Sequence, residues 1–126
     1  GDLLGVKYQG ESFNFGTEQE HLNNVQGASL HISGNKAAQG IGVEFLEYLA
    51  PTTGRPYPRD ERADDLLHWE TIMTTDNAVA LFEKLKANHV TLLSTTVITI
   101  PSQSYLYKKG FYLRDPDGHV IGIFEK

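Results

Sequence analysis

The last part of the chain, residues 110–125, constrains the fold most, because it has the pattern of a closed β-hairpin. Residues 111–113 and 120–124 are rich in aromatic and branched side chains, which favour strands. Asp115-Pro116-Asp117-Gly118 lies between them. The proline presets φ for the first turn position, and the glycine can take a positive φ without steric cost. The segment therefore predicts two antiparallel strands joined by a tight turn.

Length and composition favour a single globular domain. A chain of 126 residues, 40% apolar and 21% charged, can bury a core between two packed layers. A net charge of −5 with scattered basic residues argues against a nucleic-acid partner. No apolar run reaches the ~18 residues that a membrane span needs, so no membrane partner is expected. The absence of cysteine excludes disulfides and thiolate metal sites. A cytoplasmic location is the default expectation, because the start of the chain lacks a signal-peptide pattern.

The first half of the chain reads as three strands. Residues 6–15, with a bend at Gly10, residues 28–33 and residues 41–49 have strand composition, and their succession predicts an antiparallel meander. The polar residues 17–24 predict a loop or a single turn. Residues 50–65 are rich in proline and charge, which is typical of a linker. A linker of this length inside one small domain often borders a site.

One helix is predicted in the second half, over about residues 77–87. Its apolar residues recur at the i, i+3, i+4 and i+7 positions of one helix face, namely Ala78, Leu81, Phe82 and Leu85. Thr75 or Asp76 is expected to cap its start. Asn88 stands where a left-handed residue commonly ends a helix.

Strands are predicted on both sides of this helix, over residues 66–74, 90–93 and 97–100 and in the closing hairpin. The second half therefore has the order β-α-β-β-β. A short internal repeat relates Val43-Glu-Phe-Leu-Glu47 to Ile121-Gly-Ile-Phe-Glu125. Each copy stands as the last strand of its half, which indicates two related halves.

The segment Arg114-Asp-Pro-Asp-Gly-His-Val-Ile-Gly-Ile-Phe-Glu125 resembles the closing hairpin of the vicinal oxygen chelate superfamily, which comprises glyoxalase, bleomycin-resistance, extradiol dioxygenase and epimerase domains. The resemblance implies an α+β fold, in which paired β-α-β-β-β modules form a half-open, mostly antiparallel barrel around a cleft. Residues 1–126 would then be a single glyoxalase-like domain. Residues 66–126 match the second module, residues 50–65 the linker, and residues 1–49 a first module without its opening strand and helix.

The resemblance also implies positions for a divalent metal site. In metal-dependent relatives the first strand and the last strand of each module supply ligands to the cleft. Carried over to this chain, those positions are Glu44, which would also be the catalytic carboxylate, and His68. The last-strand position of the second module falls on Gly122, and the opening-strand position of the first module has no counterpart. Two side chains fall short of the three that catalytic metal sites usually use, so Gly122 disfavours a metal.

Strand alternation gives a separate expectation for which residues face the cleft. If Val43 and Phe45 pack beneath a helix, Glu44 points into the cleft. By the same reasoning Gly122 faces the cleft and leaves open room there. His68 can equally be a strand histidine that is hydrogen-bonded to a neighbour, and Glu44 can pair with it or with a basic residue.

The remaining candidates have simpler structural interpretations. Trp69 is expected in the core. Tyr105 and Tyr107 either border the cleft or belong to an amphipathic strand. Several acidic residues are expected to be solvated, namely Glu47 and Glu125 at strand ends and Asp64 and Asp65 in the linker. No role is assigned to the other histidines, His21, His31, His89 and His119.

Two functions compete on these grounds. The first is a binding module that holds a small-molecule ligand in its cleft without turnover, which Gly122 favours. The alternative is a glyoxalase-type lyase or isomerase, in which a metal binds vicinal oxygens of the substrate and a carboxylate moves a proton. A third possibility is an accessory domain completed by another chain. The missing opening strand and helix predict either about 20–30 further N-terminal residues or a homodimer that covers the gap.

Overall fold

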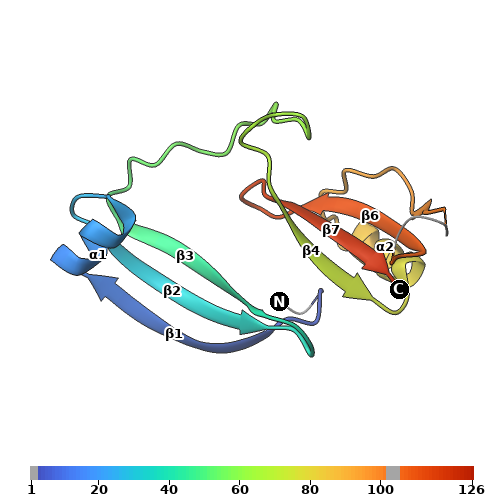
Figure 1. The fold of residues 1–126 in the computed structure, drawn as a ribbon, viewed down its shortest axis with the longest axis horizontal. Helices are drawn as coiled ribbons and strands as arrows, with labels where there is room; N and C mark the ends of the chain where they lie inside the picture. The colour runs from blue at the N-terminus through green and yellow to red at the C-terminus, as the bar shows by residue number, and fades with distance from the viewer. Residues whose placement is uncertain (1–2, 102–105) are drawn as a thin grey trace. The chain divides into compact units, whose positions relative to one another are not determined.

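The computed structural model describes residues 3–101 and 106–126 (Figure 1). Its elements follow in chain order: β1 (Lys7–Phe15), α1 (Thr17–Asn23), β2 (Ser29–Lys36), β3 (Gly42–Ala50), β4 (Glu70–Thr75), α2 (Ala78–Ala87), β5 (Ile98–Thr99), β6 (Lys109–Arg114) and β7 (Val120–Glu125). The chain forms two compact units, Gly1–Arg55 and Pro56–Lys126, each with its own sheet. Among the described residues, no helix is long and apolar enough to cross a membrane.

The first unit is the predicted antiparallel meander, with the strand order β1-β2-β3. The bend predicted at Gly10 is present, because the register of β1 against β2 shifts between Tyr8 and Gly10. Leu30 on β2 is fully buried, and Ala28 just before it is 2% exposed. In the described part of this sheet β3 is an edge strand, and its Phe45 is 54% exposed rather than packed beneath a helix.

Helix α1 corrects the prediction of a loop or single turn over residues 17–24. The helix has seven residues and is capped by Asn24, which takes a left-handed φ of 53° and donates its N–H to the Glu20 carbonyl. Asn23 ties the helix to the sheet by donating from Nδ2 to the Tyr48 hydroxyl at 2.6 Å. An almost wholly polar segment has no apolar periodicity, so hydrophobic patterning did not reveal this helix.

The second unit has the predicted β-α-β-β-β order and the sheet order β4-β7-β6-β5. Strand β4 runs parallel to β7, and the other neighbours are antiparallel. This confirms the α+β class with mostly antiparallel sheets. No strand pairing joins the two sheets in the described part of the chain, so the half-open barrel is not closed by hydrogen bonds.

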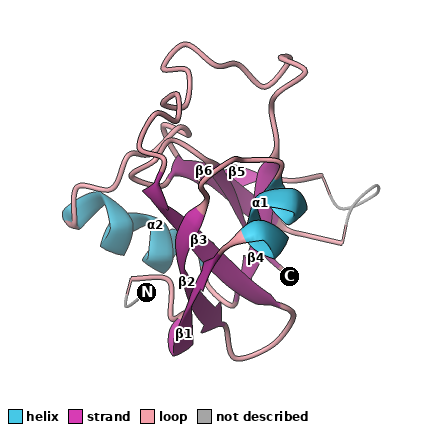
Figure 2. Cartoon of the chain, turned by 90° about the vertical axis from the view of Figure 1, so that its left-hand side faces the viewer, coloured by secondary structure: helices cyan, strands magenta, loops and turns pink. Residues whose placement is uncertain are grey.

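Helix α2 lies behind β6 and β7 in Figure 1, covers one face of the second sheet and forms the core with it; Figure 2 shows the helices and strands after a turn of 90°. The Phe82 ring meets the Phe111 ring of β6 edge to face, with centroids 5.2 Å apart. The buried helix residues Ala78 and Leu85 lie on the predicted apolar face, and Ile123 of β7 is 1% exposed. Burial of these side chains is the main stabilising term of this unit.

The ends of α2 differ by one residue from the expectation. Asn77, rather than Thr75 or Asp76, is the N-cap, and its side chain accepts a bond from Ala80 N at 2.9 Å. At the other end His89, not Asn88, takes the positive φ, at 57°. The Asn88 side chain instead donates to the Lys84 carbonyl at 2.8 Å, and this carbonyl also accepts the Asn88 backbone N–H at 3.2 Å.

The closing hairpin forms as predicted, with β6 and β7 joined at Asp115–Gly118. Asp115 Oδ1 accepts bonds from the backbone N–H groups of Asp117 at 3.0 Å and His119 at 2.9 Å. Gly118 takes the positive φ, at 103°. Strand β4 begins at Glu70 instead of residue 66, and the strand predicted over residues 90–93 is reduced to one bridge between Leu92 and Leu113.

Candidate functional site

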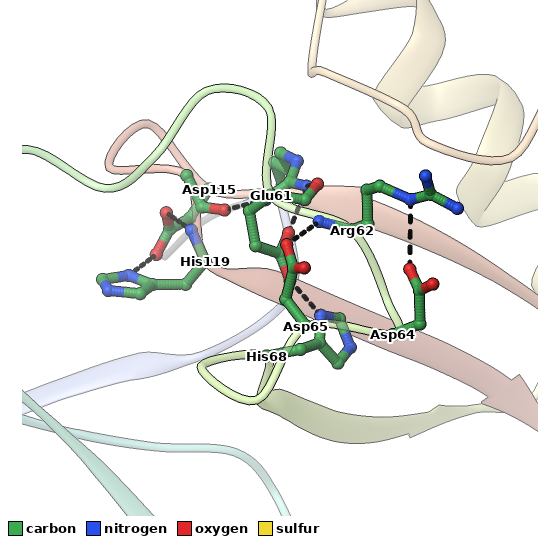
Figure 3. Close-up of polar contacts among 9 residues, drawn as sticks. Glu61, Arg62, Asp64, Asp65, His68, Asp115 and His119 are labelled. Carbon is green, nitrogen blue, oxygen red and sulfur yellow. Dashed lines mark hydrogen bonds and ion pairs between the residues drawn. The ribbon is translucent and has the colours of Figure 1, made fainter.

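The most buried polar group of the second unit is the Glu61 carboxylate, which lies in the segment predicted to be a linker. Its side chain is fully buried, and Oε2 lies 2.6 Å from Nη2 of Arg114 on β6. The other oxygen, Oε1, meets Nδ1 of His68 (Figure 3). The carboxylate therefore connects the linker, the residues before β4 and the closing hairpin.

The charges around Glu61 explain how a carboxylate can be buried here. The Arg114 guanidinium, followed by His68, holds the pKa of Glu61 below its usual range, which keeps the carboxylate ionised. Arg114 also donates to the Gly118 carbonyl in the hairpin turn. A buried ion pair with this many hydrogen bonds fixes geometry more than it adds stability. The cluster therefore acts as a clamp between the linker and the hairpin.

The aromatic residues around the hairpin turn form a second contact set. Tyr57 of the linker lies against His119, with ring centroids 5.3 Å apart, and Trp69 lies 5.1 Å from the same ring. A Cβ at Gly118 would come within 3.3 Å of Tyr57, so this position also needs a small residue. Trp69 is 51% exposed, which corrects its expected place in the core.

The two predicted metal ligands lie in different units. Glu44 is an exposed residue of β3 in the first unit, opposite Gly34 in the β2–β3 register. His68 precedes β4 in the second unit and is hydrogen-bonded to Glu61, as its alternative interpretation expected. An imidazole held by a carboxylate at Nδ1 can still offer Nε2 to a metal. However, within neither described unit do three His, Asp or Glu side chains gather into a metal-binding set.

Gly122 faces away from α2, but the space beside it is filled rather than open. A Cβ at this position would lie 2.8 Å from Ile72 Cδ1, 2.8 Å from Phe124 Cε2 and 2.9 Å from Tyr112 Cε1. The expectation of free room at Gly122 is therefore wrong, because neighbouring side chains have closed over the glycine. The position of Gly122 therefore offers no metal ligand and is surrounded by apolar groups, which does not fit a divalent metal site.

We use the term open face for the side of the second sheet opposite α2. Ile72, Gly122 and Tyr112 pair across β4, β7 and β6 and form its middle row. Phe124 belongs to the next row, and its ring lies over Gly110 as well as Gly122, since a Cβ at Gly110 would come within 2.5 Å of the ring. Two glycines thus let a phenylalanine lie flat across the sheet.

Aromatic contacts extend this surface. The Tyr107 ring stacks on Phe124 with centroids 5.0 Å apart, and Tyr112 meets Phe124 edge to face at 5.7 Å. Ile72 remains 44% exposed beside them. Burial, followed by the nearby Glu70 carboxylate, raises the pKa of the Tyr112 hydroxyl, so the phenol stays neutral and can donate to Glu70. Tyr105, predicted with Tyr107 to border the cleft, lies outside the described residues.

Of the acidic residues expected to be solvated, Glu125 differs from the expectation and Asp64 agrees with it. Glu125 is only 17% exposed, and its Oε2 accepts a bond from Ala78 N at 2.8 Å, which places a carboxylate at the N-terminus of α2. Asp64 is solvated as expected and pairs with Arg62 at 3.1 Å, with both side chains about three-quarters exposed. Glu125 therefore has a structural role that its position at a strand end concealed.

The first unit contains a histidine to which sequence analysis assigned no role. His31 on β2 lies between two carboxylates, with Nε2 2.8 Å from Glu11 on β1 and Nδ1 3.3 Å from Glu47 on β3. Its ring stacks on Phe13 at 4.8 Å. Hydrogen bonds to Glu11 and then Glu47 raise the pKa of His31, so the imidazole is more readily protonated, and it connects the three strands.

The first unit also contains a hollow of about 580 Å³ that opens to solvent. It is lined by Val25, Tyr48 and residues 51–54. None of these residues has a charged side chain. The hollow is therefore lined by apolar groups and a few hydroxyl groups, and none of its lining residues is a carboxylate or an imidazole.

Solved structures with the same arrangement of elements are known. A glyoxalase family protein from Bacillus cereus matches 98% of this chain and 80% of its own, with a TM-score of 0.80 and 18% identity. The chain has a glyoxalase-like fold. The protein SMU.1112c matches 98% of this chain and 83% of its own, with a TM-score of 0.57 and 18% identity. No family model and no curated protein matches the sequence. Since 18% identity supports the fold alone, function has to be argued from the site.

Proposed function

We propose that this chain is a small-molecule-binding module whose ligand packs against the open face of the second sheet, with no protein-bound metal in the contact. One observation carries the proposal. Where metal-dependent relatives would present a carboxylate, Gly122 is covered by Ile72, Phe124 and Tyr112, which form an apolar and aromatic surface.

The chemistry of this surface suits binding better than metal-assisted catalysis. Ligand sites are lined mainly by apolar and aromatic side chains, with a few polar groups that orient the ligand. The open face has this composition, with Tyr107 and Tyr112 each in contact with Phe124 and the Tyr112 hydroxyl as a polar group. A lyase that polarises vicinal oxygens needs a metal held by several donors, and Gly122 supplies none.

The exposure of these side chains also supports a role in binding. Apolar groups that stay half exposed in one contiguous surface often mark an interaction site, whereas scattered ones do not. Ile72 is 44% exposed and adjoins the ring cluster through Gly122. A flat aromatic or aliphatic ligand would cover Ile72 and the outer ring edges and remove their apolar surface from water.

Thermal denaturation of chelator-treated protein with a panel of aromatic compounds tests this function. A compound that binds only the folded state at 100 times its Kd should stabilise the fold by about 2.7 kcal/mol. Ile72→Ala should reduce this stabilisation. Val79→Ala is the matched control, because Val79 is 47% exposed but lies on α2. Stabilisation that requires an added divalent metal, or that Ile72→Ala leaves unchanged, would contradict the proposal.

A further inference from the structure

One carboxylate on the open face has a position that points to the charge of the ligand. Glu70 is the first residue of β4, and its side chain is exposed. It pairs with Val120 in the row next to Ile72 and Gly122, so it lies on the same face as the aromatic cluster. We infer that the ligand of the open face is a cation, an amine or quaternary ammonium group attached to an aromatic or alkyl body. This inference rests on the proposed function.

The Glu70 carboxylate is held at the edge of the aromatic cluster. It lies close enough to the Tyr112 hydroxyl to raise the pKa of that group, after burial, although the two residues belong to different strands, separated by β7. In the described part of the chain, no ion pair to Glu70 is formed. A carboxylate beside a neutral phenol, with no ion pair, keeps its negative charge available to a ligand.

The cations that could neutralise Glu70 are engaged or distant. Arg114 lies in the same row across β7, but its guanidinium is bound to Glu61 and to the Gly118 carbonyl. Lys108 lies at the opposite end of the sheet, because its N–H bonds to Glu125 at the end of β7, whereas Glu70 pairs with the start of that strand. The Glu61 clamp thus has a second consequence, which is to keep Arg114 away from Glu70.

The neighbouring rings complete a site for a cation. The Tyr112 ring lies one row from Glu70 on this face and meets Phe124 at 5.7 Å, whereas Phe124 and Tyr107, which stack on each other, extend the aromatic cluster toward the other end of the sheet. Aromatic faces attract ammonium groups, and the attraction grows as water is excluded. A carboxylate beside an aromatic cluster should therefore bind a cation with an apolar body more tightly than a neutral or anionic compound of the same size.

Three probes that share a benzyl group and differ in charge test this inference: benzylammonium, benzyl alcohol and phenylacetate. Each is titrated into the whole chain at neutral pH up to about 10 mM, and NMR shift changes give the Kd. Benzylammonium should bind about tenfold more tightly than benzyl alcohol, the range expected for a cation–π contact with an added carboxylate. Phenylacetate should bind most weakly. Added salt should weaken the binding of benzylammonium more than the binding of benzyl alcohol, because salt screens the attraction to the carboxylate.

Two variants show whether Glu70 causes the selectivity. Glu70→Gln should bring benzylammonium to the affinity of benzyl alcohol. Glu83→Gln removes the same charge from an exposed position on α2 and should leave the ratio of the benzylammonium and benzyl alcohol affinities unchanged. Equal binding of all three probes to the unaltered protein would overturn the cation inference and leave the proposed function standing. Absence of binding by every probe at the open face would instead count against the proposed function itself.

Discussion

Replacing Gly122 by alanine should destabilise the fold, because the added methyl group has no free space. Its carbon would lie 2.8–2.9 Å from three side chains. Ile72 Cδ1 can rotate away, but the Phe124 and Tyr112 ring edges are held in mutual contact and by Tyr107. Overpacking of this kind costs about 1–3 kcal/mol, and the lower entropy of the unfolded alanine chain offsets about 0.4–1 kcal/mol. The net loss should be about 0.5–2 kcal/mol.

Thermal denaturation measures this loss directly. Unfolding entropies of about 2.1 cal/mol/K per residue imply a fall in Tm of about 4 °C per kcal/mol for a chain of 126 residues, so Tm should drop by about 2–8 °C. Gly54→Ala is the control, because a Cβ there meets nothing within 4 Å, and Tm should not fall. Gly122→Glu should cost more, since it also places a carboxylate among rings. A Gly122→Ala protein as stable as the Gly54→Ala protein would refute the reasoning.

Three further predictions concern the Glu61 carboxylate, the metal content of the protein and the edge of the first sheet. The pKa of Glu61 is lower in the folded than in the unfolded state, so the ionised carboxylate stabilises the fold above the unfolded pKa of about 4.5, and this stabilisation is lost as pH falls through the folded pKa. On acidification the free energy of unfolding should therefore fall less steeply for Glu61→Gln than for the Glu83→Gln control. Dialysed protein should contain less than one divalent metal ion per chain, because Gly122 offers no ligand; elemental analysis that finds one tightly held zinc, nickel or iron would revive the lyase. We also propose that the chain is a homodimer, because β3 is an edge strand in the described part of its sheet and Phe45 is 54% exposed; light scattering at low micromolar concentration should give twice the chain mass, and a monodisperse monomer would contradict this.

The elements that the sequence predicted correctly are those with strong local signals. The turn at Asp115–Gly118 combines a proline and a glycine at positions that need them, and both strands around it have β composition. Helix α2 has an apolar face with the right period. The bend at Gly10 follows from a glycine within a strand. Each of these signals depends on a few neighbouring residues, so no knowledge of distant contacts was needed.

The errors share a different physical origin, because each depends on contacts between distant segments. Glu61 appeared as one charge among many in a linker, and only Arg114, 53 positions later, makes its burial favourable. Tyr57, an aromatic residue in the same polar segment, was a signal that the linker is anchored. A glycine in a strand predicts free room on its face, but at Gly122 the Phe124 ring from the same strand fills that room.

A chemical-shift map of a bound aromatic compound shows whether a ligand packs against the open face without a metal. Chelator-treated protein with labelled methyl groups is titrated with a benzyl compound. Ile72 lies on the open face and Ile123 lies on the face covered by α2. The account predicts saturable shifts at Ile72 without added metal and much smaller shifts at Ile123. Shifts that appear only after a divalent metal is added, or that are absent at Ile72, would contradict it.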